Sequence, residues 1–383
     1  MSRFVKLAFS ALTAAILALA PSAAFAANSA TKISTSQYPA GIFLDDAGNV
    51  FIADNAGHRL VVYPHGTGSV SLFGRVFTGG VESTFSLPSG VEAPRGVAID
   101  PISGALFFTE FSGRVWAIST RPVSLFGTTI DQAHVNTFVE IGTIPEAKGA
   151  IAFDPQGNLF AAGEDSGQIQ ILPRTASIFG NTYAINVPTQ LVQAQAFADD
   201  EDFLADIAFD NSGNLYVTAM FGNSTGVHVL SAGASTLFGH PVSSSVFTSI
   251  TEGSGVLNPC GIDIDSAGRV YFGDWGQNKV FELSSNSENV FDVPLTANVA
   301  SSIPSFNGLA NQGIAVRPNG LVLYSGALDG TYKLVNYSPA WTSLRAADAQ
   351  VLANTGPDSS LLLLTAFGLV FTGLILFRSR HSN

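Results

Sequence analysis

The stretch GIFLDDAGNVFIAD at residues 41–54 decides the fold, because similar stretches return five more times along the chain. In each copy, alternating apolar residues lead into a polar turn with glycine and then into a second apolar run, the pattern of a β-hairpin. The other copies are GVAIDPISGALFFTE at 96–110, GAIAFDPQGNLFAAGE at 149–164, DIAFDNSGNLYVTAM at 206–220, GIDIDSAGRVYFGD at 261–274 and GIAVRPNGLVLYSG at 313–326.

The copies keep a constant register when they are aligned on one position of the turn. That position holds Asp45, Asp100, Asp154, Asp210, Asp265 and Arg317, which gives a mean spacing of about 54 residues. Aspartate, asparagine and glycine suit Asx-type turns, so we interpret these aspartates as structural.

Each hairpin is followed by a third apolar segment, such as 58–63 or 114–119, and in five units by a second signature. The signature reads SLFG at 71–74 and 124–127, SIFG at 177–180, TLFG at 236–239 and, degraded, NVFD at 289–292. We expect it in the connection between strands three and four, with the aromatic ring packed between blades. A further extended segment, such as 136–141, completes four strands per unit. Six repeats of four antiparallel strands predict an all-β, six-bladed β-propeller.

The two ends of the repeat region predict how the ring closes. The last unit lacks the Phe-Gly signature, whereas residues 31–36 form an extended segment that precedes the first unit. We therefore predict that this segment supplies the outer strand of the last blade. The propeller then spans residues 27–337, and residues 338–351 form a linker or stalk.

The units resemble NHL repeats, most clearly in PAGIFLDDAGNVFIADNAGHRLVVY at residues 39–63. The shared elements are Pro-x-Gly-Ile, Asp-x-x-Gly-Asn, Ala-Asp and His-Arg. The resemblance covers residues 31 to 337. It implies the propeller fold and says little about activity.

The N-terminus has the pattern of a secretory signal peptide at residues 1–26. Arg3 and Lys6 precede an apolar run, and the small-residue site Ala24-Phe25-Ala26 predicts cleavage after Ala26. Residues 361–377 form a second uncharged run that is long enough for a transmembrane helix. Basic residues at 378 and 380 follow it and are expected to stay cytoplasmic, which leaves the propeller outside the cell.

A pentapeptide before this run resembles a sortase sorting signal of the LPxTG kind, in a region that extends over residues 352–383. It consists of Leu352, Ala353, Asn354, Thr355 and Gly356. The resemblance implies that a sortase cleaves between Thr355 and Gly356 and joins the protein to peptidoglycan. Ala353 stands where most such signals have proline, as in the LAxTG signals of some high-GC Gram-positive bacteria. A plain single-pass membrane anchor is the alternative to cell-wall attachment.

Charge and cysteine content exclude several classes of function. The formal net charge of −12 repels phosphate backbones, so nucleic acid is not expected as a partner. Cys260 is the single cysteine, so the chain can form neither an intramolecular disulfide nor a thiolate metal cluster. We interpret Cys260 as a small buried hydrophobic residue.

The loops that join strands two and three share one face of a propeller with the segments that lead into the inner strands. Acids and amides that converge there could bind calcium through oxygen ligands or recognise a sugar, or each acid could stabilise its own turn. Trp275 on this face could stack on a ligand ring. The other candidates are Arg95, Lys148, Asp206, Asn258 and Asn311 before inner strands, and Asp54, Glu110, Glu164 and Asp274 at the ends of second strands.

The histidines stand in neither an H-E-x-x-H nor a G-x-S-x-G context, so the sequence supports no hydrolytic triad. We therefore predict a cell-surface binding module that recognises a protein, peptide or glycan and requires no cofactor. The alternative is an extracellular metal-dependent hydrolase or lyase that resembles regucalcin and gluconolactonase. The Pro-Asn-Gly entry of that family is not reproduced at residues 258–261, so no metal ligand can be transferred to this chain.

Overall fold

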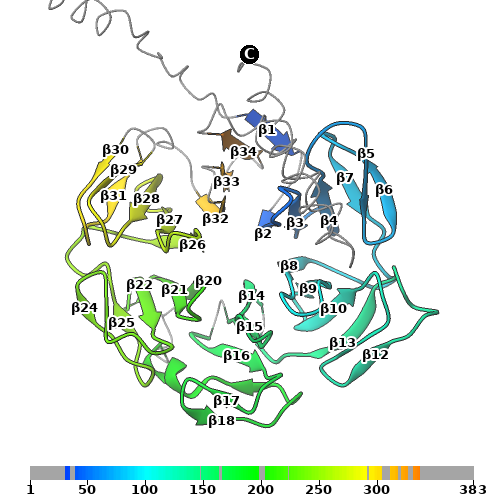
Figure 1. Ribbon diagram of the computed structural model, residues 1–383, viewed down its shortest axis with the longest axis horizontal. Coiled ribbons are helices and arrows are strands. Elements are labelled where there is room, and N and C mark those ends of the chain that lie inside the picture. Colours follow the sequence, from blue (N-terminus) through cyan, green and yellow to red (C-terminus); the bar gives the residue numbers. More distant parts are fainter. Residues whose placement is uncertain are drawn as a thin grey trace, which may run out of the picture.

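The computed structural model describes residues 31–34, 39–146, 148–163, 166–197, 203–222, 224–290, 293–303, 311–317, 321–326 and 331–336. Within these ranges, six four-stranded antiparallel sheets stand around a central opening (Figure 1). In each sheet the first strand of the repeat is innermost. The described part of the chain is therefore an all-β propeller.

Five of the sheets each come from one continuous repeat, and we number them as blades 1 to 5. Blade 1 contains β2 (Pro39–Leu44), β3 (Val50–Asp54), β4 (Arg59–Tyr63) and β7 (Ser83–Phe85). Blade 2 contains β8 (Pro94–Ile99), β9 (Leu106–Glu110), β10 (Arg114–Ile118) and β13 (Val139–Thr143). Blade 3 contains β14 (Ile151–Phe153), β15 (Leu159–Ala162), β16 (Ile169–Leu172) and β19 (Thr189–Gln190), followed by the 3₁₀ helix η1 (Val192–Phe197).

Blade 4 contains β20 (Phe203–Phe209), β21 (Leu215–Met220), β22 (Gly226–Leu230) and β25 (Thr248–Ser249). Blade 5 contains β26 (Pro259–Ile264), β27 (Val270–Asp274), β28 (Lys279–Leu283) and β31 (Ser301–Ser302). The sixth sheet consists of β32 (Asn311–Arg317), β33 (Leu321–Gly326), β34 (Thr331–Asn336) and β1 (Thr31–Ser34).

The predicted six-bladed propeller is corrected to five blades of the repeated kind, because the complete repeated unit occurs five times. In blades 1 to 5 a two-stranded hairpin interrupts the connection from strand three to strand four. In the sixth sheet these two strands come from opposite ends of the described chain, so no such connection exists to carry a hairpin. The structure thus has five blades of the repeated kind and one closing sheet of mixed origin.

The predicted closure by the N-terminal segment is confirmed. Strand β1 pairs antiparallel with β34, and Thr31 faces Leu334 in the register. The predicted signal peptide, linker, sorting signal and transmembrane helix all lie outside the described residues. Within the described residues, no helix is both long and apolar enough to cross a membrane.

The core lies between neighbouring blades. Every residue of β3, β9 and β27 is buried, because the middle strands of a blade are covered on both faces by the adjacent blades. One cluster joins Phe51 and Val62 of blade 1 to Leu106 and Phe108 of blade 2. The single cysteine, Cys260, is buried as predicted, and burial raises the pKa of its thiol to about 12.

The five hairpins were not predicted from the sequence. They are β5 (Ser69–Leu72) with β6 (Arg75–Thr78), β11 (Val123–Leu125) with β12 (Thr128–Ile130), β17 (Ser177–Ile178) with β18 (Asn181–Thr182), β23 (Thr236–Leu237) with β24 (His240–Pro241), and β29 (Glu288–Val290) with β30 (Val293–Leu295). In four of them the Phe-Gly pair forms the two-residue turn.

Both turn residues of these four hairpins have a left-handed backbone, as a type I′ turn requires. In the β11–β12 turn, φ is 51° at Phe126 and 87° at Gly127. A phenylalanine is strained in this conformation, but the turn aims its ring into the core. The Phe126 ring stacks at 6.5 Å on Phe153 of blade 3, which agrees with the predicted packing between blades.

Candidate functional site

The channel-mouth face is our name for the loops β3–β4, β9–β10, β15–β16, β21–β22 and β27–β28 together with the segments that enter the inner strands. Equivalent loops of a propeller lie on the same side of the ring. Of the predicted site residues that the structure describes, all but Asp206 therefore lie at this face. Asp206 lies instead within the inner strand β20, which corrects its predicted place before that strand.

The acids that end the second strands are engaged inside their own blades. Asp54, Glu110 and Asp274 are at most 1% exposed. The Oδ2 atom of Asp54 accepts a hydrogen bond from Arg59 Nε at 2.8 Å. The carboxylate of Asp274 accepts from the backbone amide groups of residues 257, 258 and 277. This geometry matches the interpretation in which each acid stabilises its own turn.

Glu110 joins three different residues of blade 2 through its carboxylate. Its Oε2 atom accepts from Arg114 Nη2 at 2.8 Å and from the Glu92 backbone amide at 3.2 Å. Its Oε1 atom accepts from Trp116 Nε1. Asn258 contributes backbone atoms to the equivalent loop of blade 5, where its carbonyl accepts from the Trp275 amide at 2.9 Å.

Two of the predicted residues lie outside what can be described in full. Glu164 is beyond the described residues, and Asn311 is described only as the first residue of β32. In the described ranges, no group of three or more His, Cys, Asp or Glu side chains is close enough together to hold a metal ion. The possible calcium ion stays a prediction.

Two predicted cations meet one exposed aromatic ring on the channel-mouth face. The Arg95 Cζ atom lies 4.9 Å from the centre of the Phe111 ring, and Lys148 Nζ lies 5.8 Å from the same centre. Phe111 is 45% exposed, and Lys148 also pairs with Glu146 at 3.3 Å. Two cations on one exposed ring, one of them paired with an acid, are the kind of arrangement that can contact an organic anion.

An aromatic patch lies on the same face in blades 4 and 5. The rings of Phe221 and Trp275 meet edge to face at 6.4 Å, and Phe203 meets Phe221 in the same way at 6.3 Å. Phe221 and Trp275 are 46% and 41% exposed, and the neighbouring Leu257 is 54% exposed. Apolar side chains that cluster at the surface indicate a binding surface.

Sequence reasoning found Trp275 but missed Phe111 and Phe221. All three stand directly after a second strand, since Glu110, Met220 and Asp274 end β9, β21 and β27. An alignment of the repeats on the residue that follows the second strand would have identified all three aromatic residues.

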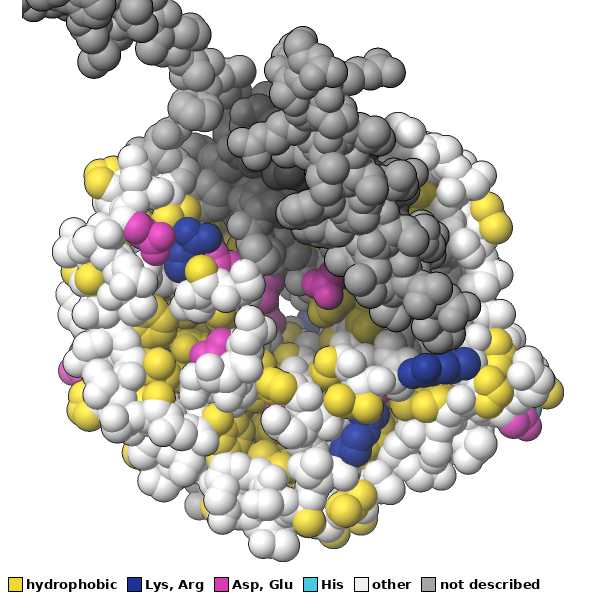
Figure 2. All heavy atoms as spheres, in the orientation of Figure 1, with side chains coloured by type: hydrophobic (Ala, Val, Ile, Leu, Met, Phe, Trp, Pro, Cys, Tyr) yellow, Lys and Arg dark blue, Asp and Glu magenta, His cyan; other side chains and the backbone are white. Residues whose placement is uncertain are grey.

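Asp206 lies in the central channel. The inner strands of all six sheets line a cavity of about 200 Å³ there, and Asp206 and Asp263 are its two acidic side chains among the described residues. The space-filling view shows the central opening with acidic side chains beside it (Figure 2). Asp206 Oδ2 accepts from the Ile262 amide at 2.9 Å, and Asp263 Oδ2 accepts from the Val316 amide at 2.8 Å.

Blade 4 carries a carboxylate where most inner strands carry glycine. The equivalent residues in blades 1, 2 and 5 are Gly41, Gly96 and Gly261, and a Cβ atom there would collide with the next inner strand. Asp206 instead bridges to that strand through its side chain. Removal from water raises the pKa of Asp206 to about 8, and repulsion from Asp263 contributes to this rise.

This pKa predicts a pH-dependent stability. Because the pKa of Asp206 is raised above 3.8 by folding, the folded protein retains a proton that the unfolded chain releases between about pH 4 and pH 8. Stability should therefore fall as the pH rises through this window. We expect the stability of the Asp206→Asn variant to fall by about 3.5 kcal/mol less than that of the wild type between pH 5 and pH 8 in urea unfolding. Equal pH profiles would contradict the raised pKa.

No protein-family model matches the sequence, and no curated protein matches it. Several solved structures have a similar fold. The calcium-binding protein regucalcin from Agrobacterium tumefaciens has a TM-score of 0.51 at 13% identity, over 80% of this chain and 93% of that chain. A gluconolactonase from Xanthomonas campestris has a TM-score of 0.50 at 12% identity, over 82% of this chain and 92% of that chain.

A third similar structure is virginiamycin B lyase from Staphylococcus aureus, a catalytically inactive variant with quinupristin. It has a TM-score of 0.48 at 16% identity, over 80% of this chain and 98% of that chain. At these identities the comparisons concern the fold alone. The chain is a β-propeller similar in fold to the regucalcin-like propellers.

Proposed function

We propose that the chain binds a small organic anion with an apolar ring at the channel-mouth face and converts it as a hydrolase or lyase. The observation that carries the proposal is the placement of the Arg95, Lys148 and Phe111 group on the same face as the Phe221 and Trp275 patch. The two cations attract the anionic group of the ligand, and the aromatic patch packs against the apolar ring of the ligand.

The make-up of this site favours a small ligand over the predicted protein, peptide or glycan. It consists of two small groups of side chains, whereas a stable protein interface needs on the order of 800 Å² on each partner. The regucalcin and gluconolactonase propellers, which share the fold, favour the same alternative. Asp206 is the candidate proton donor, because a pKa of about 8 keeps its carboxyl group protonated at neutral pH.

Binding is tested with benzoate and its neutral counterpart benzamide, with NMR titration as the measurement. We expect benzoate to bind about tenfold more tightly, because a charge-assisted contact contributes about 1.5 kcal/mol. The double variant Arg95→Met, Lys148→Met should lose this preference, and Trp275→Ala should weaken both probes. Arg121→Met is the matched control, since Arg121 contacts Ser103 in the turn on the opposite face. Equal binding of both probes by the wild type would contradict the proposed anion site.

Conversion is tested separately with an aryl lactone whose opening is followed by absorbance. We expect Asp206→Asn to lower the rate by about tenfold or more and to leave benzoate binding unchanged. If the wild type binds benzoate but no lactone is opened at any pH from 5 to 9, the catalytic part of the proposal fails and the binding part stands.

A further inference from the structure

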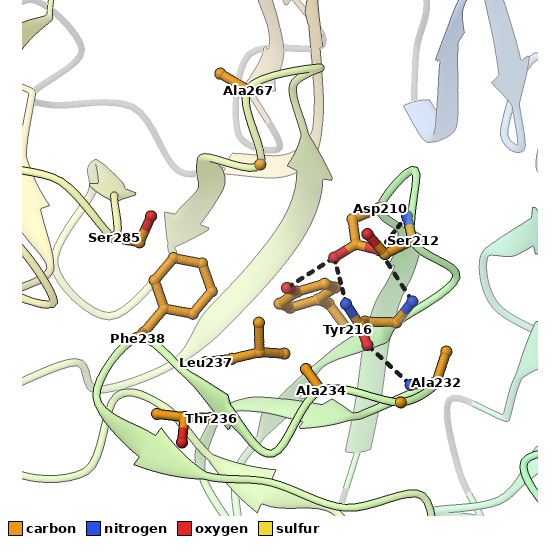
Figure 3. A pocket seen from close by; sticks show the side chains of 13 residues that line it. Asp210, Ser212, Tyr216, Ala232, Ala234, Thr236, Leu237, Phe238, Ala267 and Ser285 are labelled. Carbon is orange, nitrogen blue, oxygen red and sulfur yellow. Dashed lines mark hydrogen bonds between the residues drawn. The ribbon is translucent and has the colours of Figure 1, made fainter.

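A second pocket opens between blades 4 and 5 on the face opposite to the channel mouth (Figure 3). Its volume is about 550 Å³. Blade 4 contributes Asp210 and Tyr216 together with Phe238 of the Phe-Gly turn. Blade 5 contributes the turn residue Gly268 and, after β28, Ser285. We call this cavity the interblade pocket.

The equivalent place between blades 2 and 3 is filled by an arginine of the chain itself. Arg174 Nη1 donates to Asp100 Oδ1 at 3.0 Å, and Nη2 donates to Asp100 Oδ2 at 2.7 Å. The Arg174 Cζ atom also lies 4.9 Å from the centre of the Phe126 ring. A bidentate carboxylate and an aromatic ring thus hold one guanidinium group.

The repeat relates the two places residue by residue. Asp210 and Phe238 of blade 4 correspond to Asp100 and Phe126 of blade 2, since each pair holds the same positions of the repeat. Arg174 follows the end of β16 by two residues, and Ser285 follows the end of β28 by two residues. The interblade pocket therefore exists because a short side chain replaces the arginine.

The turn glycines give an independent measure of this difference. A Cβ atom at Gly157 of blade 3 would collide with the guanidinium group of Arg174. A Cβ atom at the equivalent Gly268 of blade 5 would meet no atom within 4 Å. The space that Arg174 occupies between blades 2 and 3 is therefore open between blades 4 and 5.

The charge of Asp210 has no basic partner among the residues that the structure describes. Its carboxylate accepts from the amide groups of Ser212 and Asn214 at 2.9 Å each, from Asn214 Nδ2 at 2.7 Å and from the Tyr216 hydroxyl at 3.2 Å. All four donors are neutral. Asp210 and the Phe238 ring line the same pocket, and the net charge of −12 adds to the attraction for a cation.

We propose that the interblade pocket binds the guanidinium group of an arginine side chain presented by another polypeptide. Phe238 provides the ring, and Asp210 provides the charge, as Phe126 and Asp100 do for Arg174. Arginine fits better than lysine because its planar group stacks and pairs at the same time. Asn214 and Tyr216 already donate to the carboxylate, so a single arginine should bind in the millimolar range.

The test uses N-acetyl-argininamide as the probe and the neutral N-acetyl-citrullinamide as its isosteric control, both titrated by NMR. We expect the arginine probe to bind at least tenfold more tightly. The Ser285→Arg variant should abolish binding, because its own guanidinium group fills the pocket as Arg174 does. Ser285 is exposed, so this substitution is compatible with the fold.

The matched control is Ser287→Arg, which adds the same charge at an exposed position that does not line the pocket. It should bind the probe as the wild type does. Phe238→Leu, which keeps the site apolar but removes the ring, should weaken binding several-fold. Equal affinity for the citrulline probe, or unchanged binding by Ser285→Arg, would overturn the proposal.

Discussion

Replacing Glu110 by alanine is expected to lower the free energy of unfolding by about 3 kcal/mol, the typical effect of removing one partner of a buried ion pair. The carboxylate is 1% exposed and holds Arg114, the Trp116 indole and the Glu92 amide together. Alanine would leave these three donors without their acceptor. Urea unfolding of the full chain measures the effect.

Glu92→Ala is the control for this variant, because Glu92 is exposed and only its backbone amide contacts Glu110. It should change stability by less than about 0.5 kcal/mol. If Glu110→Ala unfolded at the wild-type urea concentration but lost ligand binding, Glu110 would be a ligand contact and our structural interpretation would be wrong.

Replacing Phe126 by alanine is expected to destabilise the protein by about 4 kcal/mol. The ring is 8% exposed and packs on Phe107, on Phe153 of blade 3 and on the Arg174 guanidinium group. Its loss leaves a cavity between two blades. Thermal and urea unfolding should both show the effect.

Phe126→Gly separates burial from backbone strain at the same position. Both variants lose the ring, but alanine keeps a Cβ atom at a φ of 51°, whereas glycine adopts this conformation freely. The glycine variant should therefore be more stable than the alanine variant by about 1 kcal/mol. A glycine variant that is the less stable of the two would contradict the strain that we assign to the Phe-Gly turn.

Much of the architecture was predictable because the same pattern of apolar residues and turn residues recurs in each repeat. The turn aspartates accept backbone hydrogen bonds as predicted, for example Asp45 from Asn49 at 2.7 Å and Asp154 from Gln156 at 3.0 Å. The closure by β1 was also predictable, since the last repeat lacked a fourth strand. The predicted count of six blades failed because only five units carry the complete repeat of four strands and a hairpin within the described residues.

The Phe-Gly hairpins could not be predicted from the sequence pattern. Phenylalanine is unusual in the first position of a type I′ turn, where asparagine or aspartate is common, so the signature did not resemble a hairpin turn. Only the packed structure shows why phenylalanine is used in this turn. In the core of blade 1, the centre of the Phe73 ring lies 6.1 Å from that of Phe51 and 6.2 Å from that of Phe85. Burial of the ring compensates for the strained backbone.

The candidate site depended still more on tertiary structure. The recurring acids Asp54, Glu110 and Asp274 could be ligand contacts or could each stabilise a turn, and only the fold shows that each is engaged in its own blade. The exposed rings of Phe111 and Phe221 gave no comparable signal, because an aromatic residue in an apolar repeat is usually buried.

The sequence by itself determined the main strands of each unit, their period, the aspartate turns between the first two strands and the segment that closes the ring, because these depend on local alternation and turn chemistry. The tertiary structure decided which side chains meet across blades. Arg174 fills one gap between blades and Ser285 leaves another open, while Arg95 and Lys148 meet on Phe111. These contacts join residues of different repeats. The distances between the side chains depend on how whole blades pack and cannot be predicted from any one segment.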